Sequence, residues 1–420
     1  MAPRPRTLLA LLAVVVAVGG VGAFAVASGG PGLTERWVSD TESTVGGNHH
    51  AVAAARIDGR GWVFAPIGGR GGGSGCALVA LDAGGETRWS DPVPAANCTI
   101  HAVSDPAVAD RTGDGRVEVL AATTERRVTA HDPLTGEETF SWPLSDYGYT
   151  RPVVADATGD GDRNLVVLDV RGTVFVLDPD GEVWNRSFGS YTWAQPAVLD
   201  ADGDGEPEVL AGFDDGRVRS FDGATGRVEW NRSTGGPVTW LTVGDGDDDP
   251  AAEAVAATSD GRVVAIDGAR GTVEWERDLG RLAAVRAFDD ADADGVVEVY
   301  ATARDGVLRS LDARTGETEW TTALTGADVQ MTPPPSLGDV DGDGRPEVVA
   351  VTNDGIVRVI GPGTGTVRAT YERDASVYTH VTLADLDADG KDEVYVPYGD
   401  GRVVALGFGP PGYRSTSTSS

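Results

Sequence analysis

Acidic residues recur along the chain at the spacing of a calcium-binding loop. The clearest copy reads DVDGDGRPEV, from Asp339 to Val348. Aspartates at positions 1, 3 and 5 can converge on one point, glycine at position 6 permits the tight turn, and position 7 offers a backbone carbonyl. The last acid stands at position 9, whereas an EF-hand has it at position 12. The alternative interpretation is an acidic hairpin turn that holds no metal.

The pattern occurs seven times, at intervals of 44 to 49 residues. Because so many copies of mutually repulsive acids need a cation to offset them, we expect structural calcium in about seven loops. Threonine at position 3 or asparagine at position 9 lowers the charge of two loops, and Pro250 replaces the glycine of another. The residues at positions 1, 3, 5, 7 and 9 are Asp110, Thr112, Asp114, Arg116 and Glu118; Asp156, Thr158, Asp160, Asp162 and Asn164; Asp200, Asp202, Asp204, Glu206 and Glu208; Asp245, Asp247, Asp249, Ala251 and Glu253; Asp290, Asp292, Asp294, Val296 and Glu298; Asp339, Asp341, Asp343, Arg345 and Glu347; and Asp385, Asp387, Asp389, Lys391 and Glu393.

An eighth copy, AARIDGRGWV from Ala54, has lost most of its acids. In an alignment without gaps, Ala54 takes the place of the first acid, Arg56 that of the second, Asp58 that of the third and Trp62 that of the glutamate. We interpret this copy as a repeat that kept the turn and lost the metal.

Short strand-like runs must position these loops. In the repeat around Asp110 they read PAVAD, VEVLAATT, RRVTAHD and EETFSW, and four strands in about 45 residues are typical of one β-propeller blade. Aromatic residues end the fourth run of seven repeats: Trp89, Trp142, Trp184, Trp230, Trp275, Trp320 and Tyr371. The last repeat lacks its fourth strand, and LTERWV with Trp37 can supply it from the N-terminal side. The prediction is an all-β, eight-bladed propeller of four-stranded blades, closed by the N-terminal strand pairing into the last blade.

Two family resemblances follow from these motifs, and together they cover residues 33–409. The acidic loops resemble FG-GAP/VCBS repeats, whose loops bind calcium. The segments SFDGATGRVEW, AIDGARGTVEW and SLDARTGETEW resemble the tryptophan-docking repeat of PQQ-like propellers, a superfamily of quinoprotein dehydrogenases and BamB-like scaffolds. The resemblance implies aromatic residues that staple adjacent blades.

Four of the five histidines gather in one sector of the predicted channel mouth. Counting five residues back from each loop places His49, Asp105, Arg151, Gln195, Trp240, Val285, Pro334 and His380 on one ring. Two histidines and a carboxylate can hold a transition metal or act as an acid–base pair, and the third interpretation is a polar channel lining. The candidate ligand-binding residues at the mouth are His49, His50, His101, Asp105, Arg151, Trp193, Gln195, Trp240, Arg286 and His380.

The ends and the charge of the chain indicate an exported protein. Residues 1–28 carry two arginines and then an uncharged apolar run, which predicts a cleaved signal peptide or an N-terminal membrane anchor. Residues 33–409 form the predicted propeller, and residues 410–420 a flexible tail. The net charge is −31, with Lys391 the single lysine, which is typical of a halophile's surface and disfavours nucleic-acid binding. Cys76 and Cys98 are expected to pair in an oxidising compartment.

The function expected from these features is a non-enzymatic, surface-anchored binding or scaffold module for proteins or glycans. A secreted form is expected if the leader is cleaved. The alternative is a PQQ-dependent quinoprotein-type oxidoreductase with its cofactor in the channel. The sequence lacks the adjacent cysteines of quinoprotein alcohol dehydrogenases and a clear acid in the right place, so calcium rather than PQQ is the expected cofactor. No catalytic residue is assigned.

Overall fold

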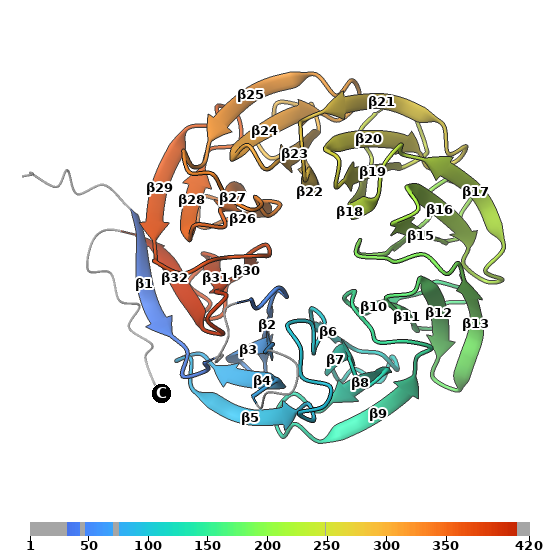
Figure 1. Cartoon of the computed structure of the whole chain (residues 1–420), viewed down its shortest axis with the longest axis horizontal. Coiled ribbons are helices and arrows are strands. Elements are labelled where there is room, and N and C mark those ends of the chain that lie inside the picture. Colours follow the sequence, from blue (N-terminus) through green and yellow to red (C-terminus); the bar gives the residue numbers. More distant parts are fainter. Residues whose placement is uncertain (1–31, 43–46, 70–74, 248, 410–420) are drawn as a thin grey trace, which may run out of the picture.

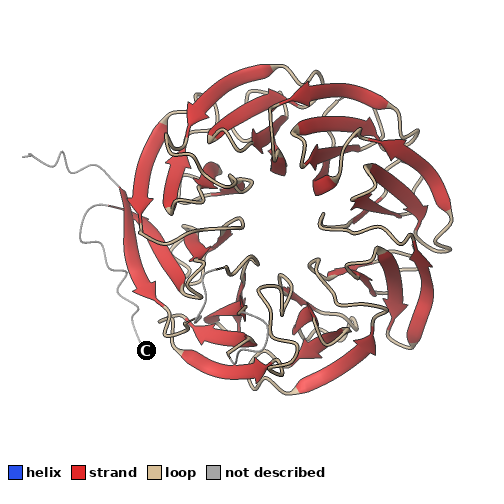
Figure 2. Cartoon of the chain, viewed as in Figure 1, coloured by secondary structure: helices blue, strands red, loops and turns tan. Residues whose placement is uncertain are grey.

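Eight four-stranded antiparallel sheets follow one another around a ring (Figure 1). The computed structural model describes residues 32–42, 47–69, 75–247 and 249–409. All regular structure in these residues is strand (Figure 2), as the repeat predicted. The predicted leader (1–28) and tail (410–420) lie outside the described residues. Within the described ranges, no helix is long and apolar enough to cross a membrane.

Each repeat forms one blade, with its strands ordered from the channel outward. Blade 1 contains β2 (Ala53–Ile57), β3 (Arg60–Ile67), β4 (Ala77–Asp82) and β5 (Thr87–Pro92). Blade 2 contains β6 (Ala107–Ala109), β7 (Glu118–Thr123), β8 (Arg127–His131) and β9 (Glu138–Pro143). Blade 3 contains β10 (Val153–Ala155), β11 (Asn164–Leu168), β12 (Thr173–Asp178) and β13 (Gly181–Ser187). Blade 4 contains β14 (Ala197–Leu199), β15 (Glu208–Phe213), β16 (Arg217–Asp222) and β17 (Val228–Ser233).

The other four blades repeat this order. Blade 5 contains β18 (Val238–Gly244), β19 (Glu253–Thr258), β20 (Arg262–Asp267) and β21 (Val273–Asp278). Blade 6 contains β22 (Ala284–Asp289), β23 (Glu298–Thr302), β24 (Val307–Asp312) and β25 (Thr318–Ala323). Blade 7 contains β26 (Ser336–Gly338), β27 (Glu347–Val351), β28 (Ile356–Ile360) and β29 (Val367–Glu372). Blade 8 contains β30 (Thr382–Ala384), β31 (Glu393–Pro397), β32 (Val403–Gly409) and β1 (Gly32–Val38).

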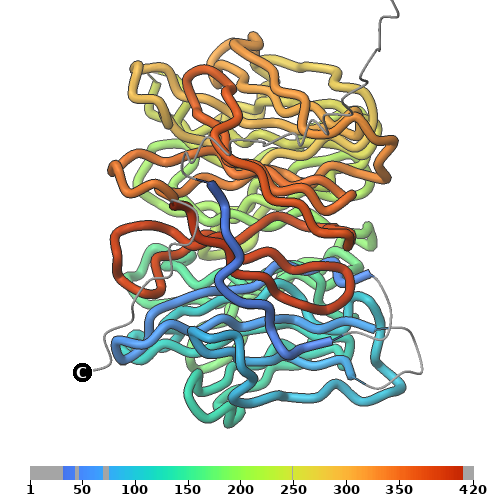
Figure 3. Tube along the Cα trace, turned by 90° about the vertical axis from the view of Figure 1, so that its left-hand side faces the viewer, coloured from blue at the N-terminus to red at the C-terminus, as the bar shows by residue number. Residues whose placement is uncertain are grey.

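Strand β1 completes blade 8 from the opposite end of the chain. It pairs antiparallel with β32, from Gly32 opposite Gly409 to Val38 opposite Val404. Figure 3 shows β1, in blue, beside the red C-terminal strands. Trp37 lies opposite Ala405, just as Trp89 lies opposite Ala80 in blade 1.

The hydrophobic core is divided among the interfaces between blades. The second strand of a blade is buried along its length, as in β23. In the outermost strand, exposed and half-buried side chains alternate, as in β25. One cluster joins Leu210 and Val218 of blade 4 to Ala254 and Val264 of blade 5. Because each core needs two neighbouring blades, a blade has no complete core of its own.

Aromatic side chains of the outermost strands dock on the next blade. The indole Nε1 of Trp275 donates to the carbonyl of Ala313 (2.6 Å), and its ring lies where a Cβ on Gly316 would be 2.6 Å away. Gly316 has φ of +67°, so both the backbone and the ring require glycine there. Trp89, Trp184 and Trp230 make the same bond to the next blade.

Two of the seven aromatic residues predicted at the ends of the fourth strands, Trp142 and Tyr371, stand two residues beyond the docking position. In blade 2 that position holds Phe140, opposite Ala130, while Trp142 lies opposite Val128. In blade 7 it holds Ala369, opposite Val359, so the assignment of Tyr371 was wrong. Its hydroxyl instead donates to Glu35 of β1 (2.9 Å).

Candidate functional site

Backbone amides hold each acidic loop in shape. In the loop from Asp339, the position-1 carboxylate accepts from the amides of Gly342 (2.7 Å) and Gly344 (2.8 Å). The position-5 carboxylate, on Asp343, accepts from the amide of Arg345 (2.9 Å). Both glycines have positive φ, which points successive amides inward. These hydrogen bonds fix the shape of the loop.

Five of the seven loops bring at least three carboxylates together. One oxygen from each acid lies within 4.8 Å of the others in these groups: Asp200, Asp202 and Glu208; Asp247, Asp249 and Glu253; Asp290, Asp292, Asp294 and Glu298; Asp339, Asp341 and Glu347; and Asp385, Asp387 and Glu393. Among the described residues, the loops from Asp110 and Asp156 form no such group. Both carry threonine at position 3, as the sequence analysis noted.

The loop from Asp290 gathers three aspartates around the buried carboxylate of Glu298. Glu298 is 1% exposed. Its Oε2 accepts from the Tyr300 hydroxyl (3.0 Å), whereas its Oε1 is buried without a hydrogen-bond partner. Burial, with the charges of Asp292 and Glu319, raises the pKa of Glu298 to about 8. A buried carboxylate oxygen beside three aspartates is a favourable ligand for a hard cation.

The residue just before the docking position on the outermost strand is acidic in some blades and basic in others. The residue immediately before the docking position is Arg88, Thr139, Val183, Glu229, Glu274, Glu319, Arg368 and Arg36 in blades 1 to 8. Blades 4, 5 and 6 thus add a glutamate, and burial with the charge of Asp247 raises the pKa of Glu274 to about 7. This neighbouring position was not identified from the sequence, although the aligned tryptophan-docking segments contain it.

In blades 7 and 8 an arginine from this position neutralises the loop. Arg368 forms ion pairs with Asp341 (3.1 Å) and Glu347. Arg36 forms them with Asp387 (3.0 Å) and Glu393 (3.4 Å). The loop of blade 2 has Arg111 on Glu118 (3.1 Å). The loops from Asp339 and Asp385, which carry aspartate at positions 1, 3 and 5, therefore already contain a positive charge.

The decayed loop of blade 1 is two residues shorter than the others. Trp62 lies opposite Ala55, as Glu118 lies opposite Ala109, so Arg56 and not Ala54 stands at position 1. The alignment without gaps was wrong here, although Trp62 does replace the glutamate. Asp58 and Gly59 both have positive φ and form a two-residue hairpin turn. Arg56 donates to the carbonyls of Leu386 (3.0 Å) and Gly59 (3.2 Å).

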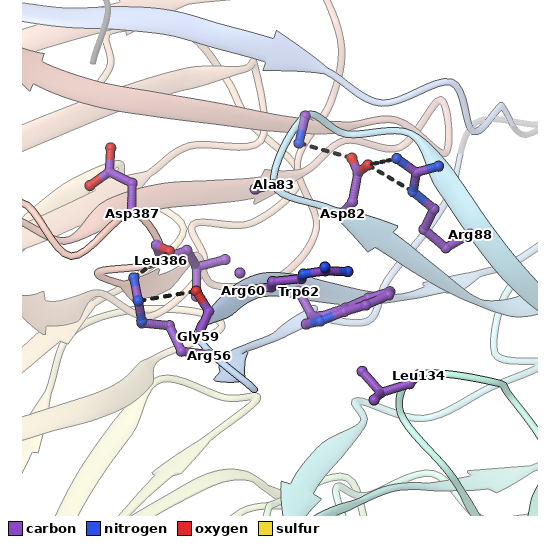
Figure 4. A pocket seen from close by; sticks show the side chains of 12 residues that line it. Arg56, Gly59, Arg60, Trp62, Asp82, Ala83, Arg88, Leu134, Leu386 and Asp387 are labelled. Carbon is purple, nitrogen blue, oxygen red and sulfur yellow. Dashed lines mark hydrogen bonds and ion pairs between the residues drawn. The ribbon is translucent and has the colours of Figure 1, made fainter. Parts of the chain in front are cut away.

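A cavity of about 880 Å³ lies where this loop was shortened (Figure 4). Three arginines in its lining, Arg56, Arg60 and Arg88, face two aspartates, Asp82 and Asp387. Arg88 is paired with Asp82.

At the channel mouth, a carboxylate holds a chain of two imidazoles. Asp105 accepts from the amide of Ala51 and contacts Nδ1 of His50, both at 2.9 Å. Since the carboxylate fixes the proton at Nδ1, Nε2 of His50 accepts from Nδ1 of His101 (3.3 Å). Among the described residues, neither imidazole bonds to a serine or cysteine. The hydrogen bond from His50, together with the charge of His380 and the amide of Ala51, outweighs burial and lowers the pKa of Asp105.

The predicted ring is therefore wrong by two residues in blade 1, because the loop there is shorter. Ala51 takes the ring position, and His50 rather than His49 meets Asp105. His49 instead stacks on Tyr378, with ring centroids 4.5 Å apart. His380 lies against Trp240. The described residues thus do not gather His49, Asp105 and His380 around one metal position.

Three cavities are lined by the innermost strands and the loops before them, and they share lining residues. The mouth cavity, of about 300 Å³, is lined by residues that include His49, His101, Tyr149, Trp193 and Trp240. Burial and neighbouring histidines lower the pKa of His49 to about 4 and that of His101 to about 3, so both are neutral near pH 7. Two deeper cavities, of about 290 and 490 Å³, share linings that include Arg151, Arg286 and His380. Gln195 and Trp240 line both the mouth and the larger of these.

The two cysteines form a disulfide in the structure, Cys76 to Cys98, with Cα atoms 5.4 Å apart. It links the start of β4 to the loop before β6. Both side chains are buried against the core shared by blades 1 and 2.

Comparisons with known proteins agree with this architecture. The family model described as outer membrane protein assembly factor BamB matches residues 124–343, and an FG-GAP-like repeat model matches residues 339–396. No curated protein sequence matches the chain.

Several solved structures share the fold. BamB from Moraxella catarrhalis has a TM-score of 0.62 at 17% identity, over 90% of this chain and 100% of that one. The Vibrio cholerae biofilm matrix protein Bap1 has a TM-score of 0.68 at 14% identity, over 91% of each chain. The quinohemoprotein alcohol dehydrogenase ADHIIG from Pseudomonas putida has 0.64 at 13%, over 91% of this chain and 77% of that one. Because the BamB model spans more than half of the sequence, the chain belongs to that family of PQQ-like β-propellers, and it carries FG-GAP-like repeats.

Proposed function

We propose that the chain is an exported, surface-anchored, calcium-stabilised propeller that binds proteins or glycans without catalysing a reaction. The channel carries this proposal. Its mouth combines aromatic rings, neutral imidazoles and the amide of Gln195. The adjoining polar part of the channel, here called the waist, is lined by Arg151, Arg286 and His380. This combination suits ligand binding. The carboxylate–imidazole chain there ends without a nucleophile among the described residues. The predicted leader supports export and anchoring.

Calcium would stabilise the loops of blades 4, 5 and 6. The carboxylates of Asp200, Asp247 and Asp290 and their loop partners would hold it, with Glu229, Glu274 and Glu319 adding negative charge nearby. The unpartnered Oε1 of Glu298 fits such a ligand. When bound, the metal supplies the positive charge that arginine supplies in blades 7 and 8. Its binding energy would add to the free energy of unfolding.

We also propose that β1 closes the ring. Its pairing with β32 joins residues more than 300 positions apart. Closure by such a strand leaves no open sheet edge at blade 8.

The test is binding of the purified, calcium-loaded chain to an array of defined glycans and to purified envelope proteins. Trp193→Ala removes an aromatic ring of the mouth and should abolish binding. Trp142→Ala, on the outer strand of blade 2, is the matched control and should retain it. Binding that survives Trp193→Ala would place the ligand elsewhere. Dye-linked alcohol oxidation after loading with PQQ would instead favour the oxidoreductase.

A further inference from the structure

Two arginines, from blades 3 and 6 of the ring, line the same part of the channel, the waist. Arg151 precedes β10, and Arg286 lies on β22. The pairing of β22 with β23 shifts between Val285 and Ala287, so Arg286 is the extra residue of a β-bulge. Bulges re-aim a side chain. Both arginines line the same two deep cavities.

Neither arginine has a carboxylate partner. Within the described parts of the chain, no ion pair involves Arg151 or Arg286. The guanidinium of Arg286 donates to the Ser336 hydroxyl (3.3 Å). The nearest acid in the lining, Asp105, already accepts from His50, from the Ala51 amide and from Gln195 (3.3 Å).

This arrangement is electrostatically unfavourable without an anion. Burial, with the neighbouring charge of Arg151, lowers the pKa of Arg286 to about 10. A charge held partly out of water without a partner is costly. Arg286 is half-buried, and many arginines elsewhere on this acidic protein pair with an acid. The fold therefore keeps two cations together where an anionic ligand can approach from the channel.

We propose that Arg151 and Arg286 bind the carboxylate of an acidic sugar, a uronate, whose ring lies against the aromatic residues above them. The guanidinium fork matches a planar carboxylate. Trp240 and Gln195 line both the mouth and the waist, so a sugar ring beside them would lie within reach of the arginines. This inference rests on the proposed function, because it takes the channel as the binding face.

The experiment is calorimetric titration of the folded chain with galacturonate, galactose and inorganic phosphate. Galacturonate should bind at least tenfold more tightly than galactose, since a hydrogen bond to a charged group contributes about 1.5–3 kcal/mol. Arg151→Gln and Arg286→Gln should each weaken galacturonate binding about tenfold or more. Arg163→Gln, at an exposed loop of blade 3, is the control and should change nothing. Arg286→Lys keeps the charge without the fork and should give an intermediate loss.

Several results would overturn the uronate assignment. Equal binding of galactose and galacturonate, or galacturonate binding that both glutamine variants retain, removes the role of the arginines. Tighter binding of phosphate than of galacturonate would assign the site to a phosphorylated ligand. If folded protein binds no galacturonate at millimolar concentrations, the inference fails, whereas the array test of the Trp193→Ala variant decides the proposed function separately. Should Arg286→Gln not fold, Arg151→Gln alone decides, because Arg151 is exposed.

Discussion

Exchanging charge at the position before the docking residue tests whether the acidic loops of blades 4 to 6 bind calcium while arginine takes its place in blades 7 and 8. Glu319→Arg in blade 6 would place a guanidinium beside the four acids of the Asp290 loop, as Arg368 does beside the acids of blade 7. Arg368→Glu makes the reverse change and leaves Asp341 and Glu347 without their cation. The first variant should lose a calcium ion and the second should gain one.

The magnitude follows from the spacing of the carboxylates. Two charges 4.8 Å apart repel by about 3.5 kcal/mol at an effective dielectric constant of about 20, and salt reduces this. A calcium concentration about a hundred times the dissociation constant stabilises a loop by about 2.7 kcal/mol. The metal-free Glu319→Arg variant should therefore exceed the metal-free wild type in free energy of unfolding by about 2–3 kcal/mol.

The assay combines metal counting by mass spectrometry with unfolding in the presence and absence of a chelator. The wild type should retain three calcium ions, in blades 4 to 6, and the two variants two and four. Chelation should shift the melting temperature of Glu319→Arg less than that of the wild type. Glu317→Arg makes the same charge change in the exposed turn before β25 and should match the wild type. Equal calcium content in all four proteins would refute the division.

Three further predictions concern stability. In chelator, the melting temperature should rise as the pH falls from about 8 to about 5. Burial raises the pKa of Glu298 to about 8, so the folded state binds protons more tightly than the unfolded state. A melting temperature that falls over this pH range would contradict the prediction. Trp275→Ala should lower the free energy of unfolding by about 3–5 kcal/mol in denaturant titration, because it empties a buried docking site, and a cost equal to that of Trp142→Ala would argue against docking. Replacing Cys76 and Cys98 by serine should lower it by about 3 kcal/mol, and reduction of the wild type should reproduce the loss.

Repetition made most of the fold predictable. The repeat of the acidic loops predicted eight blades, and the strand-like runs predicted four strands in each. Every blade packs on its neighbours in the same way, so the same residue pattern recurs in each repeat. The likeness of Trp37 to Trp89 also located the partner of β32, since both stand opposite the same position of the third strand.

Sequence spacing failed where a repeat changed its length or its register. The two residues missing before Trp62 cannot be seen in an ungapped alignment, and they moved the histidines of blade 1 off the predicted ring. Tyr371 looks like a docking aromatic until pairing shows that Ala369 occupies the place. The arginines of blades 7 and 8 act across strands, so their role depends on contacts that loop spacing does not contain.

The pairing of β1 with β32 also constrains the order in which the protein assembles. The Thr34 hydroxyl donates to the carbonyl of Gly407, 373 residues later. Strand β1 therefore cannot pair until β32 has been synthesised. Until then its edge is exposed, while blades 1 to 7 can already pack on one another in sequence. A chain truncated before Val403 should therefore fold with an open ring and two exposed sheet edges, which favour pairing with other chains.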